Sequence, residues 1–139
     1  MSPYLFHPMA VHFPLVLLIL GLPLAASARR RWGPVWAEEA APWFLGGGTA
    51  GLWVALALGV LAEHTVPHVP AAWRTMEAHE QGAWTTVLIF SALSAAWWAA
   101  RGRFRGALLM VWALGLLALI WTAHQGAHLV FEYGVGGPS

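Results

Sequence analysis

Residues 106–131 read GALLMVWALGLLALIWTAHQGAHLVF, an apolar run of membrane length. A helix needs about 20 consecutive apolar residues to cross a hydrocarbon core about 30 Å thick. Three further runs of this kind precede it, and together they predict spans at 8–28, 42–64, 72–100 and 105–131 within a single transmembrane domain of residues 1–139. Backbone in hydrocarbon must satisfy its own hydrogen bonds, so the sequence predicts an all-α integral membrane protein, an antiparallel four-helix bundle.

The composition supports the membrane assignment and excludes several functions. The chain is 59% hydrophobic and 9% charged, and it contains no Lys, Asp or Cys. Without Cys it cannot form a disulfide, a thiolate-held iron–sulfur cluster or a covalently attached c-type haem. The net charge of +1 gives no basic footprint for nucleic acid. No serine lies in a nucleophile-elbow context, so a hydrolytic enzyme is not expected.

The arginines predict the orientation in the membrane. Arg74 lies on one side, whereas six residues flank the other side, namely Arg29, Arg30, Arg31, Arg101, Arg103 and Arg105. By the positive-inside rule, both termini then face the periplasmic side of a bacterial plasma membrane. The first run is not read as a signal peptide, because its positive charges follow the apolar stretch instead of preceding it.

All seven histidines fall near the outer ends of the predicted spans, at His7, His12, His64, His68, His79, His124 and His128. Histidine at an interface can be an ordinary amphipathic side chain, but imidazoles that reach into hydrocarbon are costly unless paired and indicate function. His124 and His128 are four residues apart and share a helix face. His7 and His12 are separated by about 140° on a regular helix. We expect His12 to be the more buried of the two and the better ligand, His7 to start the helix, and His68 to lie in a loop.

Haem b is the cofactor that this histidine layer favours. It needs two axial imidazoles, an apolar slot, and small residues where the macrocycle meets the backbone. Gly59, Gly82 and Gly126 occur close to histidines in the sequence. We predict one or two haems near the outer face, with Arg74 beside the propionates and with axial ligands drawn from His12, His64, His79, His124 and His128. Such a protein would carry electrons between quinol and a periplasmic acceptor.

Two other functions fit the same residues. A copper, zinc or iron ion could be held by several histidines together with Glu63, Glu77, Glu80 or Glu132, although no tight ligand pattern such as HExxH occurs. A cofactor-free scaffold or assembly subunit is the third reading, and a homo-oligomer is compatible with all three. Glu132 and Tyr133 are either contacts for a quinone head group or ordinary interfacial residues. The two halves of the chain do not align well enough to indicate a duplication.

The strings HPMAVHFP at residues 7–14 and GAHLVFEYGVG at residues 126–136 resemble the DUF2231 family of small four-span bacterial membrane proteins. With His79 at the head of the third span, the resemblance covers essentially the whole chain. Similar segments occur joined to Rieske-type or c-type cytochrome domains, so the resemblance implies membrane electron transfer with haem or quinone. The positions that match the family are His7, His12, His79 and the 126–136 tail. His64, His68, His124 and His128 lie outside the family pattern.

Overall fold

Four long helices make up the computed structural model, which describes residues 6–28, 33–66 and 69–135. They are α1 (Phe6–Ser27), α2 (Trp36–Glu63), α3 (Trp73–Ala99) and α4 (Arg105–Phe131), and the short 3-10 helix η2 (Pro70–Ala72) leads into α3. Each of the four is long and apolar enough to cross a membrane. The predicted all-α membrane bundle of four spans is therefore confirmed.

The start of α2 differs most from the sequence prediction. The helix begins at Trp36, before the predicted start at residue 42, and Pro42 lies inside it. Two carboxylates, Glu38 and Glu39, occupy its first turn, where the partial positive charge of a helix N-terminus favours them. Glu38 Oε1 also pairs with Arg105 Nη2 at 3.0 Å, which ties the start of α2 to the start of α4. Polar residues that suggested a loop are thus the first turn of a helix.

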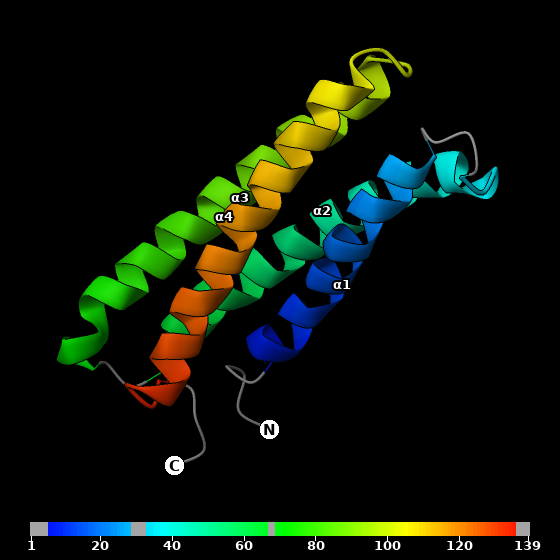
Figure 1. Ribbon diagram of the computed structural model, residues 1–139. Coiled ribbons are helices and arrows are strands. Elements are labelled where there is room, and N and C mark those ends of the chain that lie inside the picture. The colour runs from blue at the N-terminus through cyan, green and yellow to red at the C-terminus, as the bar shows by residue number, and fades with distance from the viewer. Residues whose placement is uncertain (1–5, 29–32, 67–68, 136–139) are drawn as a thin grey trace.

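The helices form two hairpins that lie side by side (Figure 1). One hairpin is α1 with α2 and the other is α3 with α4, and the helices contact each other more closely within a hairpin than between hairpins. The hairpins meet mainly along α2 and α3, and to a lesser extent along α1 and α4. Helix α1 begins and α4 ends at the same end of the bundle, which we call the histidine end.

Trp112 connects α4 to α1 and to α3 in the core. Trp112 on α4 is fully buried, and its indole N–H donates to the carbonyl of Leu18 on α1 at 3.1 Å. The same ring meets Trp97 edge to face, with centroids 5.7 Å apart. A Cβ at Gly21 would lie 2.8 Å from the Trp112 ring, so glycine there lets α1 approach α4. The hydrogen bond to Leu18 and the contact with Gly21 join the two hairpins, whereas the contact with Trp97 lies within the second hairpin.

The buried residues reveal a structural repeat that the sequence comparison missed. Every buried residue of α1 has a buried counterpart 72 positions later in α3, the pairs being Pro14 and Thr86, Leu18 and Phe90, Gly21 and Leu93, and Ala25 and Trp97. Buried residues of α2 and α4 match with a spacing of 67, namely Leu45 and Trp112, Gly48 and Gly115, Thr49 and Leu116, Leu52 and Leu119, and Ala55 and Thr122. The two hairpins therefore bury equivalent positions, although few of the paired residues are identical.

Candidate functional site

His7 lies in the first turn of α1 and points at α2. Its Nδ1–H donates to the carbonyl of Ala55 at 2.8 Å. Gly59, one turn further along α2, makes room for the ring, because a Cβ there would lie only 3.0 Å from Cε1 of His7. The imidazole is thus fixed by one hydrogen bond and by contact with bare backbone.

His79 occupies the equivalent place in the second hairpin. Its Nδ1–H donates to the carbonyl of Thr122 on α4 at 2.9 Å, and a Cβ at Gly126 would lie 2.9 Å from its Cε1 atom. His79 follows His7 by 72 positions, the spacing that relates α1 to α3. Thr122 follows Ala55 by 67 positions, and Gly126 follows Gly59 by the same number, the spacing that relates α2 to α4. Each hairpin therefore contains the same arrangement, an imidazole that donates to a backbone carbonyl and packs against a glycine.

The two imidazoles face each other across the boundary between the hairpins. Their ring centroids are 6.1 Å apart, with an interplanar angle of 82°. A carbonyl oxygen can only accept, so the proton of each neutral ring sits on Nδ1 and the Nε2 atom keeps its lone pair. The pair therefore offers two unprotonated ring nitrogens, one from His7 and one from His79.

The expectation that His12 is more buried than His7 was wrong. His12 is exposed, and its Nδ1–H donates to the carbonyl of Pro8 within the same helix, whereas His7 is half-buried. The inward face of α1 runs through Pro14, Leu18, Gly21 and Ala25, and His7 lies seven residues before Pro14 on the same face. Extending this buried face by two turns towards the N-terminus of α1 places His7 on it.

The remaining histidines do not join this pair. His64 follows the end of α2 and is exposed, as is Arg74 near the start of α3. His68 lies outside the described residues. In the part of the chain that the structure describes, no group of three or more His and acidic side chains lies close enough to hold a metal ion.

His124 and His128 form a separate arrangement on α4. Their Nε2 atoms are 3.0 Å apart, and His128 Nδ1 contacts Glu132 Oε1 at 3.0 Å. His124 follows Thr122 by two residues, which is about 200° around a helix. The two histidines therefore lie on the face of α4 opposite to the one that contacts His79.

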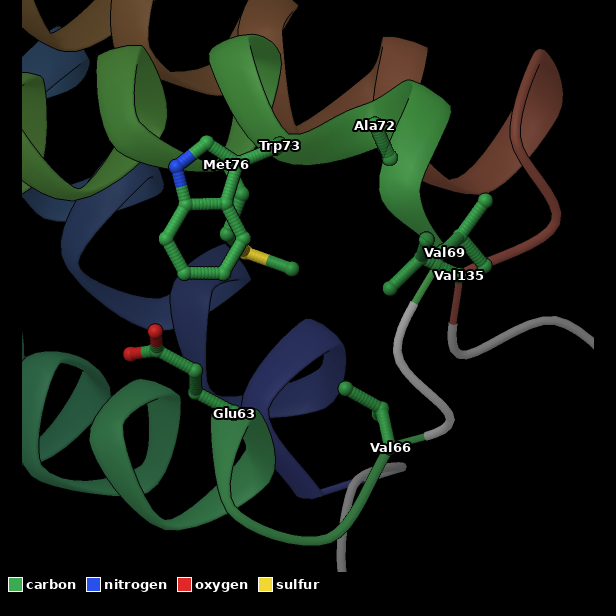
Figure 2. Close-up of a pocket in the computed structure, with 7 residues that line it drawn as sticks. All are labelled: Glu63, Val66, Val69, Ala72, Trp73, Met76 and Val135. Atoms are coloured by element: carbon green, nitrogen blue, oxygen red, sulfur yellow. The ribbon is translucent and has the colours of Figure 1, made fainter.

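A small apolar hollow lies beside the pair, towards the histidine end. Its volume is about 30 Å³, and its lining is Glu63, Val66, Val69, Ala72, Trp73, Met76 and Val135. Glu63 is one turn beyond Gly59, and Met76 is one turn before His79, so the hollow adjoins the pair along α2 and α3. Figure 2 shows the Glu63 carboxylate extending from α2 towards the Trp73 side chain. A carboxylate thus lies one helical turn from the glycine that contacts His7.

The family model for predicted membrane proteins designated DUF2231 matches residues 4–138. The chain belongs to the DUF2231 family. The family description states that its members are predicted membrane proteins, in agreement with the four spans. Neither a curated protein nor a solved structure matches the chain.

Proposed function

We propose that this protein is a membrane b-type cytochrome in which His7 and His79 are the axial ligands of one haem b. The observation that carries the proposal is the symmetric pair of imidazoles, each fixed through Nδ1 and each with a free Nε2 atom. Metal-ligating histidines usually donate their other ring N–H to a carbonyl or carboxylate, which sets the tautomer and raises the basicity of the ligand. Both histidines have this partner before any metal is bound.

The spacing of the pair fits a metal between the two rings. His7 and His79 would hold the iron through their Nε2 atoms, the ring nitrogens that the carbonyl hydrogen bonds leave free. The observed centroid separation is 6.1 Å. The flat macrocycle of a haem separates its two axial ligands, and here the ligands belong to different hairpins. The boundary between the hairpins, where helices contact each other least, is the natural place for it.

The number of donors favours haem over a bare metal ion. Haem iron already carries four porphyrin nitrogens, so two imidazoles complete its coordination. A structural zinc ion takes four protein ligands and a catalytic one takes three. Within the described residues, His7 and His79 are not joined by a third His or acidic side chain. Gly59 and Gly126 let the two imidazoles pack directly against the backbone of α2 and α4.

Bound haem would supply one-electron redox chemistry, and the chain would set its environment. Two imidazole ligands leave no open position on the iron, so the role is electron transfer and not oxygen chemistry. Arg74, exposed near the start of α3, is our candidate partner for a propionate. Hydrogen bonds from Nδ1 to backbone carbonyls keep both rings oriented through the change of redox state.

The partners and the location are part of the same proposal. The distribution of arginines supports a periplasmic location of the histidine end in a bacterial plasma membrane. Quinol in the bilayer is the donor that we propose, and a periplasmic cytochrome or Rieske-type protein is the acceptor. Quinol oxidation releases protons, and Glu63 in the hollow beside the pair is the nearest proton acceptor on α2.

The visible spectrum of the purified full-length protein tests the proposal. We expect one haem per chain, with a Soret band and a sharp reduced α-band typical of two imidazole ligands. Glutamine can still donate to a carbonyl but does not ligate iron, so His7→Gln and His79→Gln should each lose the spectrum while keeping the helical circular dichroism signal. His12→Gln is the matched control on the same helix, and its spectrum should be unchanged. A colourless protein from a haem-replete host would overturn the proposal, as would a spectrum that survives both substitutions in the pair.

A further inference from the structure

A second pair of histidines lies on the outer face of α4, separate from His7 and His79. His124 and His128 are one turn apart, their rings meet with centroids 4.4 Å apart, and their Nε2 atoms are 3.0 Å apart. Without a metal, one Nε2–H donates to the other nitrogen. Two imidazole nitrogens that face each other so closely can also share one metal ion.

The nitrogen separation matches a chelated transition metal. With metal–nitrogen bonds of about 2.0–2.1 Å, two nitrogens 3.0 Å apart subtend roughly 90° at the metal. This is the angle between neighbouring ligands in square-planar and octahedral complexes, the geometries that copper(II) and nickel(II) prefer. The separation of the two nitrogens already suits such an ion, and each ring would turn so that its Nε2 lone pair points at the metal.

Glu132 supplies the supporting contact that such sites require. Its Oε1 atom lies 3.0 Å from Nδ1 of His128, which fixes the ring with its Nε2 atom towards His124. Carboxylate–histidine–metal arrangements of this kind orient the ligand and raise its basicity. The three residues are spaced by four positions, so a single helix face carries the whole arrangement.

The position on α4 makes the arrangement accessible to ions from water. A helix of 27 residues is about 40 Å long, so its last turns extend beyond a hydrocarbon core about 30 Å thick. His128 is three residues from the end of α4, and the side chains of His128 and Glu132 are 35% and 56% exposed. The last turn of α4, which carries His128 and is followed by Glu132, therefore reaches the boundary between hydrocarbon and water, from which an ion can approach.

We infer that His124 and His128 chelate one divalent transition-metal ion in the headgroup layer, with Glu132 as a positioning residue and copper(II) as the tightest-bound ion. The order of affinity follows from the ligands, because imidazole sites bind first-row ions in a series that peaks at copper. The inference does not depend on haem, since the two sites lie on opposite faces of α4 and share no ligand.

Copper(II) titration of the tag-free full-length protein in detergent tests the inference. We expect one ion per chain with micromolar affinity, nitrogen hyperfine structure in the electron paramagnetic resonance spectrum, and weaker binding of nickel(II) and zinc(II). His124→Ala and His128→Ala should each weaken binding at least tenfold, and Glu132→Gln should weaken it by about tenfold. His12→Ala and His64→Ala, at other exposed histidines, should change nothing.

The outcomes separate this site from the haem pair. Loss of copper binding in the His124 and His128 variants, with the visible spectrum and the helical signal unchanged, supports the inference whether or not haem is present. Copper binding that survives the double His124→Ala, His128→Ala substitution overturns it. Copper binding that disappears only with His7→Gln or His79→Gln also overturns it, because the ion would then occupy the pair.

Discussion

Substituting Gly126 with alanine tests how tightly the site is built. The new Cβ would lie 2.9 Å from Cε1 of His79, and ordinary van der Waals contact begins at 3.4 Å, so the ring must move by about half an ångström. The movement lengthens the 2.9 Å hydrogen bond to Thr122 beyond a good geometry. A lost hydrogen bond costs about 1 kcal/mol, and overpacking costs about 1–3 kcal/mol. Alanine is about 1 kcal/mol better than glycine in a helix, so the net loss should be about 1–3 kcal/mol.

Gly46→Ala is the matched control for this substitution. Gly46 lies on α2, and a Cβ there would meet nothing within 4 Å, so only the gain in helix propensity remains. Thermal unfolding in detergent, followed by circular dichroism, should therefore shift in opposite directions for the two variants. The Gly126→Ala protein should also bind haem about tenfold more weakly, since displaced ligand support typically costs that much. Equal unfolding temperatures for the two variants would refute the described packing of His79 on α4.

Three further substitutions probe the fold and its orientation. Trp112→Phe removes the indole donor to Leu18 and leaves a void in the core, so unfolding should be easier by about 2 kcal/mol in the same thermal assay; an unchanged transition would contradict the role of Trp112 in joining the hairpins. Arg105→Gln breaks an ion pair whose carboxylate is largely exposed, so the free energy of unfolding should fall by less than about 1 kcal/mol. A larger fall in the same assay would contradict the idea that water screens this ion pair. Because the chain has no cysteine, Thr65→Cys should react with a membrane-impermeant maleimide in intact cells, whereas Val35→Cys should react only after permeabilisation. The reverse pattern would invert the proposed orientation.

The fold could be predicted because hydrocarbon leaves few choices. A run such as residues 106–131 must be a helix in the membrane, and α4 indeed begins and ends within a residue of it. The start of α2 was harder, because Glu38 and Glu39 suggest a loop by composition alone. In the structure both carboxylates lie at the helix N-terminus, which favours negative charge, and Glu38 also pairs with Arg105, which belongs to a distant part of the sequence.

The site was predicted only in outline. One-sided histidines indicated a layer, and His79 was among the ligand candidates, but depth along a helix misjudged which of His7 and His12 is the more buried. Burial depends on which face a residue occupies, and that face is fixed by packing against α2. The repeat was hidden for the same reason. Its matched positions pair Leu45 with Trp112 and Pro14 with Thr86, which share burial but not chemistry.

The repeat accounts for the position of the proposed haem between the halves of the protein. One hairpin provides one imidazole, one accepting carbonyl and one glycine, which is half of a bis-histidine site. Placing two such hairpins face to face brings the second imidazole opposite the first without any additional ligand. If the pair works as a unit, His7→Gln and His79→Gln must have the same effect on haem content, although one residue lies in the first turn of the chain's first helix and the other lies well inside α3. A protein that tolerated one substitution and not the other would use a single axial ligand, and the symmetry of the hairpins would then have no part in its chemistry.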